Sequence, residues 1–179
     1  IHNHLLYLFL LFFLSILVLD NLEKINPNFH LYFMLDLSGN NALITGASGG
    51  IGKAITKQLH SLGAHVYISG SNIAKLEALG LELGDNYTIK QCNLSDAKAC
   101  EELFNDIDKL DILVCNAGIT RDGLAMKMSN KDFDDVIDVN LKANFIVNKA
   151  AIKKMIRARY GRIINISSVV GVSGNPGQA

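Results

Sequence analysis

The sequence predicts an α/β fold, a doubly wound parallel sheet with helices on both faces in three layers. Short apolar runs alternate with longer segments whose apolar residues recur at helical spacing. A glycine-rich turn joins the first apolar run to the first helical segment. Hydrophobic residues make up 49% of the 179 residues and charged residues 19%, which is enough apolar material for a buried core and excludes a disordered chain.

The first half of the fold follows from two strands and two helices. A strand is expected over residues 41–45, followed by a helix that ends at Gly63 as a C-cap glycine. The apolar face of this helix is formed by Ile51, Ala54, Ile55, Leu59 and Leu62. A second strand is expected over residues 65–69, and Asn72 is suited to cap the next helix. That helix carries Ile73, Leu76 and Leu79.

The second half continues the alternation. A third strand is expected over residues 88–94, with Ser95 capping a helix that carries Leu103, Phe104 and Ile107. Residues 111–115 form a short, apolar fourth strand, as a buried parallel strand should be. Ser129 and Asp132 form the capping-box pattern of a long helix that is expected to end at Gly161. Its apolar positions are Phe133, Val136, Ile137, Leu141 and Phe145. A fifth strand follows over residues 162–167.

Residues 1–35 differ in composition and are expected to lie outside the fold, which is assigned to residues 36–179. The apolar run over residues 5–19 is shorter than the roughly 20 residues of a membrane-spanning helix. A signal peptide would have a positively charged segment before this run and a cleavage pattern after it, and the sequence has neither. We interpret this extension as an over-extended reading frame with the true start at Met34. The alternative is membrane association through residues 5–19.

Charge and cysteine content exclude further classes of protein. Seventeen Lys and Arg balance seventeen Asp and Glu, so the chain has no overall basic field that would hold nucleic acid. The cysteines Cys92, Cys100 and Cys115 have neither C-x-x-C spacing nor a nearby His, so no metal site is expected. Their odd number suits a reducing compartment, and a cytoplasmic location is expected.

The turn over residues 45–52 (TGASGGIG) predicts a Rossmann-type dinucleotide site. Gly46 permits the tight turn, Gly50 lets the backbone approach a pyrophosphate, and Gly52 lets the helix pack against the strand. The amides and the dipole at the helix N-terminus favour the phosphates. The spacing is T-G-x-x-x-G-x-G rather than G-x-G-x-x-G. A tight turn without a ligand is the alternative interpretation.

The end of the second strand indicates which dinucleotide is bound. NAD-binding folds place an acidic residue about 20 residues after the turn, where it binds the ribose 2′-hydroxyl. Residues 69–72 (SGSN) contain no acid, which favours NADP(H) over NAD(H) because a carboxylate would repel a 2′-phosphate. Ser71 is a candidate donor to that phosphate, and Lys53 is the nearest basic candidate in the sequence.

Several ordered motifs resemble those of the short-chain dehydrogenases/reductases, above all the bacterial members that reduce 3-oxoacyl chains on acyl carrier protein. The likeness runs from about Met34 to Ala179. Its motifs are residues 45–52, Asn116-Ala117-Gly118, residues 118–122 (GITRD), Asn140, residues 161–171 (GRIINISSVVG) and residues 174–179 (GNPGQA).

The resemblance implies a role for each matching residue. Those that would line the cofactor phosphates are Gly46, Ala47, Ser48, Gly49, Gly50, Ile51 and Gly52, with Ser71 beside the 2′-phosphate. Those along the adenine and ribose are Asn93, Leu94, Asn116, Ala117 and Gly118. Asn140 matches the active-site Asn and Ser168 the catalytic Ser. The family usually carries Arg at the position of Gly49, so that contact with NADP is lost here.

The reaction implied is NADPH-dependent reduction of 3-oxoacyl-[acyl-carrier-protein] to the 3-hydroxyacyl form in fatty-acid biosynthesis. Ser168 would hydrogen-bond the carbonyl oxygen, and Asn140 would support a water chain. The Tyr and Lys of the family's active site have no counterpart before the sequence ends at Ala179, so the chain is expected to be an inactive fragment. The alternatives are another short-chain dehydrogenase acting on a small ketone or alcohol, and a non-catalytic nucleotide-binding remnant.

Six basic residues near the end of the long helix form a cluster with no acid among them. They are Lys149, Lys153, Lys154, Arg157, Arg159 and Arg162. One interpretation is a solvated helix face, and the other is a dock for an acidic partner. The resemblance implies acyl carrier protein as that partner, with Arg159 at a docking position. It also implies a homotetramer assembled partly through the long helix that carries Asn140, so the fragment is expected to aggregate or to fail to fold.

Overall fold

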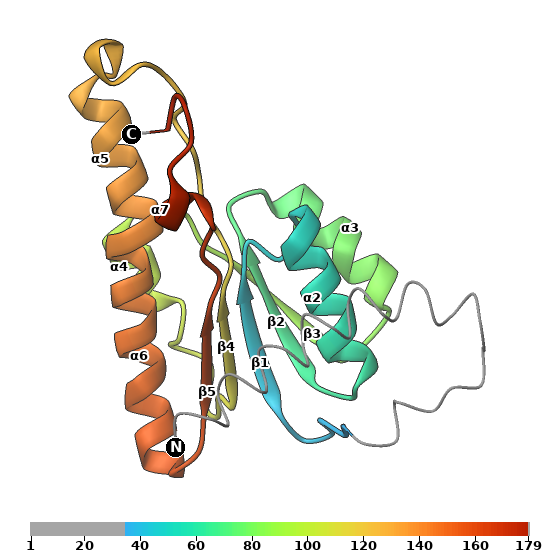
Figure 1. Ribbon diagram of the computed structural model, residues 1–179. Helices are drawn as coiled ribbons and strands as arrows, with labels where there is room; N and C mark the ends of the chain where they lie inside the picture. The colour runs from blue at the N-terminus through green and yellow to red at the C-terminus, as the bar shows by residue number, and fades with distance from the viewer. Residues whose placement is uncertain (1–34, 179) are drawn as a thin grey trace. The chain divides into compact units, whose positions relative to one another are not determined.

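The computed structural model describes residues 35–178, in which one parallel sheet of five strands is flanked by helices (Figure 1). The strands are β1 (Asn41–Thr45), β2 (His65–Gly70), β3 (Tyr87–Gln91), β4 (Ile112–Cys115) and β5 (Arg162–Asn165). Their order across the sheet is β3-β2-β1-β4-β5. The chain therefore adds strands outward from β1 to β3, returns to the middle and continues outward with β4 and β5. This is the doubly wound α/β architecture that the sequence predicts.

Helices cover both faces of the sheet. The helices α2 (Gly50–Ser61) and α3 (Ile73–Leu83) contact β1, β2 and β3 on one face. On the other face, α4 (Ala97–Glu102) packs against α6 (Ala143–Ala158), and α6 contacts β4. A short helix, α7 (Val170–Ser173), follows β5.

Alternating strand residues bury apolar side chains on both faces. Leu43, Leu113 and Cys115 belong to the cluster that α4 and α6 cover, together with Phe104 and Val147. The neighbouring strand residues on the opposite face are also fully buried, toward α2 and α3; they are Ala42, Ile44, Val66 and Ile68. Burial on both faces explains why the strands are almost continuously apolar.

A long helical rod crosses the α4 side of the sheet (Figure 1). It consists of α5 (Asn130–Ile137), a π-helical segment (Asp138–Lys142) and α6. The predicted capping box is confirmed, since the Ser129 side chain accepts from the Asp132 amide and the Asp132 carboxylate accepts from the Ser129 amide. The π-helical turn, closed by a bond from the Ala143 amide to the Asp138 carbonyl, was not predicted.

Several predicted boundaries were wrong. The strand β3 ends at Gln91 rather than at residue 94, because Asn93 forms a turn in which its Oδ1 accepts from the Ser95 amide at 3.1 Å. Asp96 caps α4 instead of Ser95. The helix α6 ends before Arg159, whose φ of +52° stops the helix two residues ahead of Gly161. The strand β5 ends at Asn165 rather than at residue 167.

Two predicted apolar faces differ from the buried ones. Phe133, Ile137, Leu141 and Phe145 are 54%, 37%, 63% and 66% exposed, and with Ile152 and Ile156 they form an exposed row that we call the rod stripe. In α2, Ile51 is 64% exposed, and the buried positions are Gly52, Ile55, Thr56 and Leu59. Periodicity identifies an apolar face but does not say what covers it.

Some predictions concern residues that the structure does not describe. The apolar run over residues 5–19, the proposed start at Met34 and the last residue, Ala179, all lie outside residues 35–178. Within that described range, no helix is both long enough and apolar enough to cross a membrane.

Candidate functional site

The strand order reverses between β1 and β4, and ligands of open α/β sheets bind beyond the carboxyl ends of the strands at such a point. Two segments border this position. The glycine turn leaves β1 at Thr45, and residues 116–118 leave β4 at Cys115. The amide of Ala47 donates to the Ser69 carbonyl at 3.0 Å, which joins the turn to the end of β2 as well.

Asn116 ties the two segments together. Its Nδ2 donates to the carbonyls of Thr45 at 3.1 Å and Gly46 at 3.3 Å. In return, the buried Thr45 hydroxyl accepts from the amides of Asn116 at 3.1 Å and Ala117 at 3.2 Å. The role of Thr45 was not predicted, although a hydroxyl residue at the strand end before the glycine turn was a signal for it. The turn and the segment after β4 therefore form one hydrogen-bonded unit.

The three key glycines of the turn meet different surroundings. Gly46 has a φ of +64°, and a Cβ there would lie 2.9 Å from the Ala117 Cα. A Cβ on Gly52 would lie 2.1 Å from the Gly46 carbonyl oxygen and 2.6 Å from Asn116 Nδ2. A Cβ on Gly50 would meet nothing within 4 Å. Gly46 and Gly52 are thus required by packing, whereas Gly50 borders open space that a ligand can approach.

The N-terminus of α2 faces the same open space. Its N-cap is Gly49, so no side chain caps the helix, and its first turn contains no acidic residue. First-turn amides have no acceptor within their own helix, and the helix dipole makes this end electropositive. Gly49, Gly50 and Ile51 are exposed, and Ser48 is half-buried beside them. The turn is therefore suited to bind an anionic group such as a pyrophosphate.

At the end of β2, Ser71 is exposed and its carbonyl accepts from Gln91 Nε2 at 3.0 Å. The next residue, Asn72, caps α3 as predicted. Lys53 does not face this position freely, because its Nζ lies 2.6 Å from Glu82 Oε1 on α3. Glu82 also pairs with Lys57 at 2.7 Å, and the two lysines lower its pKa to about 2.

Asn93 and Leu94 lie in the turn between β3 and α4. Asn93 is exposed, and its Oδ1 is used by the Ser95 amide. Leu94 is partly buried against the core cluster that α4 and α6 cover, and its carbonyl accepts from the Cys100 thiol at 3.6 Å. The Leu94 side chain therefore contributes to the core, which leaves Asn93 as the residue of this pair that faces solvent.

Asn140 and Ser168 border the carboxyl ends of β4 and β5. Asn140 lies in the π-helical segment, and its carboxamide binds the backbone of Ile119, just after the Asn116–Gly118 motif. The Ile166 amide donates to the Cys115 carbonyl at 2.8 Å, which continues the pairing of β4 with the segment that leads to Ser168. Ser168 is exposed, and its hydroxyl accepts from the Val170 amide at 3.2 Å.

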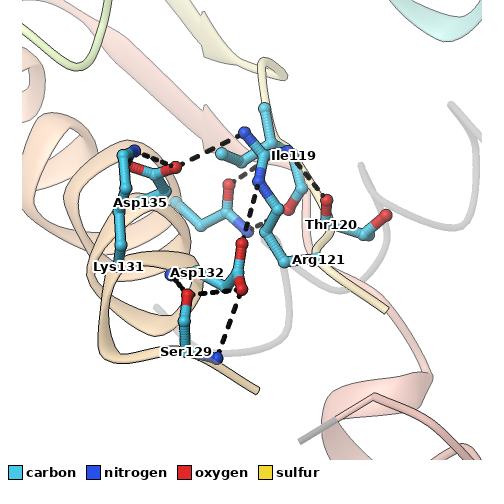
Figure 2. A network of polar contacts seen from close by, with 8 residues as sticks. Ile119, Thr120, Arg121, Ser129, Lys131, Asp132 and Asp135 are labelled. Carbon is cyan, nitrogen blue, oxygen red and sulfur yellow. Dashed lines mark hydrogen bonds and ion pairs between the residues drawn. The ribbon is translucent and has the colours of Figure 1, made fainter. Parts of the chain in front are cut away.

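A polar network holds the loop after β4 to the start of α5 (Figure 2). Arg121 lies 3.9 Å from Asp132 and 3.5 Å from Asp135, and Lys131 lies 2.8 Å from Asp135. These hydrogen bonds and cations lower the pKa of both carboxyl groups: for Asp132 the Ser129 side chain is the largest cause, and for Asp135 it is Lys131. Beside the network is a hollow of about 290 Å³, lined by Thr120, Arg121, Asp122, Gly123, Lys127, Met128 and Asp132. The sequence did not identify these residues as part of a site.

The basic cluster lies away from these residues, at the far end of α6. Arg159 follows Asn140 by nineteen residues, which corresponds to roughly 28 Å along a helix. None of the six basic side chains forms an ion pair with another residue of the described range 35–178. The Arg162 guanidinium lies 5.0 Å from the centre of the Tyr160 ring. The basic cluster therefore does not lie beside Ser168 of the same chain.

Comparison with known proteins agrees with this geometry. Residues 40–179 match the sequence profile of the short chain dehydrogenases. A 3-oxoacyl-[acyl-carrier-protein] reductase of Rickettsia bellii is 70% identical over 146 residues, which cover 82% of this chain and 61% of the relative. Nodulation protein G of Rhizobium sp. is 50% identical over 149 residues, covering 81% of this chain and 61% of that protein.

A solved structure of a short chain dehydrogenase/reductase family protein has a TM-score of 0.77 and 29% identity. The match covers 80% of this chain and 61% of the solved chain. The chain thus spans about 61% of the length of the relatives that it matches.

Proposed function

The chain belongs to the short-chain dehydrogenase family, and from this premise we propose that it is the cofactor-binding part of an NADPH-dependent 3-oxoacyl-[acyl-carrier-protein] reductase. The product would be the 3-hydroxyacyl form, as a step of fatty-acid biosynthesis. The observation that carries the proposal is the glycine turn, which Asn116 fixes from one side and which leaves open space at Gly50 on the other. The 70% identity to the Rickettsia bellii reductase supports the choice of substrate class over a small ketone or alcohol.

NADPH is the cofactor we propose, in preference to NADH. Residues 69–72 offer no carboxylate to a ribose 2′-hydroxyl, and the exposed Ser71 would donate to a 2′-phosphate. Lys53 is occupied by Glu82, and Gly49 has no side chain to reach the phosphate. The preference would therefore rest on Ser71 and on the absence of an acid. The three cysteines are free thiols, which suits the cytoplasmic location we propose.

The chemistry assigned to this chain is orientation and charge stabilisation. A bound reduced nicotinamide supplies a hydride to the carbonyl carbon of the substrate. Ser168 would donate a hydrogen bond to the carbonyl oxygen, where negative charge develops. Asn140 would hold the Ile119 backbone and thereby the cofactor-side motif Asn116–Gly118. The proton that completes the hydroxyl has no Tyr–Lys source in residues 161–179, so we propose that these 179 residues alone do not turn over a ketone.

The partner we propose for the basic cluster is acyl carrier protein. None of the cluster's side chains forms an ion pair within residues 35–178, which leaves its charge available to attract an acidic surface. Because it lies roughly 28 Å along the rod from Asn140, it would serve the site of a second copy rather than its own.

Self-association through the rod stripe provides that arrangement. The stripe presents Phe133, Ile137, Leu141 and Phe145 to solvent along α5 and α6. The rod is net acidic at one end, where Asp132, Asp134, Asp135 and Asp138 outnumber Lys131 and Lys142, and it is basic at the other. Antiparallel pairing of two rods would bury both stripes and bring opposite charges together, with a homotetramer as the proposed assembly.

The proposal is tested with a chimera of residues 34–179 and the part of the Rickettsia bellii reductase that this chain does not match. We expect NADPH oxidation with a 3-oxoacyl-[acyl-carrier-protein] substrate, and a loss of at least 100-fold in kcat for Ser168→Ala. Arg159→Glu is expected to weaken use of the carrier-bound substrate and to spare a small ketone, with Lys98→Glu on α4 as the matched charge control.

Two outcomes would reject parts of this proposal. A folded chimera that is inactive, beside an active parent reductase, would reject the function. Equal losses on both substrates for Arg159→Glu would reject the docking role alone.

A further inference from the structure

The loop over residues 119–123 contacts Asn140 at one end and the segment that follows Ser168 at the other. At its start, Asn140 binds the Ile119 backbone. At its end, the Gly123 amide donates to the Gly177 carbonyl at 2.7 Å, and Asp122 Oδ1 accepts from Gln178 Nε2 at 3.1 Å. Gly177 and Gln178 belong to the segment that follows Ser168 and α7. The position of this loop therefore affects the positions of the cofactor motif before it and of the segment after Ser168.

One side chain in the middle of the loop reaches the rod. The Arg121 guanidinium addresses two carboxylates on successive turns of α5, Asp135 through Nη2 and Asp132 through Nε (Figure 2). Its Nη1 also donates to the Thr120 carbonyl at 3.1 Å, within the loop itself. A planar guanidinium can serve such separate acceptors at once, which an ammonium group cannot do in the same way.

Both carboxylates are held in place by other groups. Asp132 uses Oδ2 to accept from the Ser129 hydroxyl at 2.6 Å, and its Oδ1 faces Arg121. Asp135 accepts from Lys131 at 2.8 Å through both oxygens. The acidic pair is thus oriented by α5 itself, and Arg121 binds to acceptors that are already in position.

We propose that Arg121 is a positioning residue that fixes the 119–123 loop against α5 and so sets the geometry of the cofactor motif Asn116–Gly118. The inference rests on the proposed function insofar as that motif borders a dinucleotide. Each ion pair is solvent-exposed and weak by itself. Together, the two ion pairs of Arg121 are expected to slow local opening of the loop by about 2- to 10-fold and to leave the stability of the sheet unchanged.

The test compares matched charge removals in the chimera of residues 34–179 with the remaining part of the Rickettsia bellii reductase, which serves as wild type. Arg121→Gln removes the charge that contacts Asp132 and Asp135. Arg121→Lys keeps the charge but loses the planar guanidinium that reaches both carboxylates. Asp135→Asn removes one of the two carboxylates without disturbing the capping box. Lys127→Gln removes a charge from the lining of the same hollow, and Asp134→Asn removes a neighbouring carboxylate on α5. Neither control residue has an ion pair within residues 35–178. The measurements are amide hydrogen exchange at Ile119, Gly123 and Leu43, and NADPH affinity by fluorescence.

We expect faster exchange in the loop alone, together with weaker NADPH binding. Arg121→Gln should speed exchange at Ile119 and Gly123 by about 2- to 10-fold and raise the NADPH Kd by a similar factor, with Leu43 in β1 unchanged. Asp135→Asn should act in the same direction, Arg121→Lys should rescue part of the effect, and the Arg121→Gln/Asp135→Asn double variant should be no worse than Arg121→Gln. Both controls should match wild type.

Three outcomes would overturn the proposal. The first is that Ile119 and Gly123 exchange no faster in Arg121→Gln than in Lys127→Gln. The second is that exchange at Leu43 speeds up as much as exchange in the loop. The third is that the effects of Arg121→Gln and Asp135→Asn on loop exchange add in the double variant. If Arg121→Gln does not fold, Arg121→Lys and Asp135→Asn decide the question by the same criteria. If wild type does not bind NADPH, the proposed function fails while the exchange rates still test Arg121.

Discussion

The carboxamide of Asn140 binds both backbone groups of Ile119: Oδ1 accepts from the amide at 2.9 Å, and Nδ2 donates to the carbonyl at 2.8 Å. This pair connects the rod to the loop that leaves β4. It also orients the Asn140 side chain fully, because both of its polar atoms are used. The π-helical turn that contains Asn140 is a local departure from the α-helix at the residue for which we propose an active-site role.

Asn140→Ala is expected to destabilise the chain by about 1–3 kcal/mol, because two partly buried backbone groups of Ile119 lose their partner. The matched control is Asn144→Ala, which removes one bond, from Asn144 Nδ2 to the Asn140 carbonyl at 2.7 Å. Urea unfolding measures both variants. A smaller loss for Asn140→Ala than for Asn144→Ala would contradict the assignment of Asn140 as the clamp on the loop.

Gly52→Ala and Gly50→Ala are expected to behave oppositely, although they are two residues apart in the same turn. The Gly52 variant places a Cβ 2.1 Å from the Gly46 carbonyl oxygen, so we expect a loss of about 3 kcal/mol. The Gly50 variant meets open space, so its stability should stay the same or rise by up to about 1 kcal/mol. Thermal unfolding of the two proteins checks this difference, which would be absent if the turn packed differently.

Acid should weaken the link between α2 and α3. Lys53 and Lys57 lower the pKa of Glu82 from an ordinary 4.5 to about 2. The stability that this carboxylate contributes is therefore fully present above pH 4.5 and is lost as the pH falls toward 2. Glu82→Gln should remove this part of the pH dependence, as measured by urea midpoints at low salt.

Glu77→Gln is the control for this acid effect, since Glu77 lies on the same helix and has no ion pair within residues 35–178. Its urea midpoints should follow those of wild type across the same pH range. Parallel curves for wild type and Glu82→Gln would refute the coupling of Glu82 to the two lysines.

The rod stripe should govern self-association. Phe145→Glu places a charge in the middle of the stripe and is expected to shift the chain toward monomer. Val172→Glu is the control, because Val172 is 91% exposed on α7 and lies outside the stripe. Sedimentation velocity distinguishes the two, and an unchanged assembly in Phe145→Glu would show that the stripe is not the interface.

Local signals in the sequence predicted local structure well. The capping box of Ser129 and Asp132 and the cap at Asn72 each depend on residues within a few positions of one another, and both are confirmed. The C-cap of α2 is Leu62 rather than the predicted Gly63, which follows it with a φ of +94°. The doubly wound parallel sheet was also predicted, from the alternation of strands and helices and from the glycine turn, because few topologies fit parallel strands with right-handed crossovers. The order of its strands was not predicted.

Features that depend on distant residues could not be predicted in this way. The bond from Asn116 to Gly46 joins residues that are 70 positions apart. The pairing of Lys53 with Glu82 depends on how α2 crosses α3, which spacing does not encode. The apolar row Phe133, Ile137, Leu141 and Phe145 was visible, but only the fold shows that another face of the rod covers the sheet. The assignment of residues 1–35 to an extension and the individual cofactor contacts stay predictions.

The most direct test of the central claim is the binding of NADPH to the chimera of residues 34–179 and to its Gly50→Ala variant. If the turn binds the cofactor phosphates, wild type binds NADPH more tightly than NADH, and Gly50→Ala weakens NADPH binding at least 10-fold while its unfolding midpoint does not fall. Folded wild type that does not bind NADPH, or equal affinity in Gly50→Ala, would contradict the account.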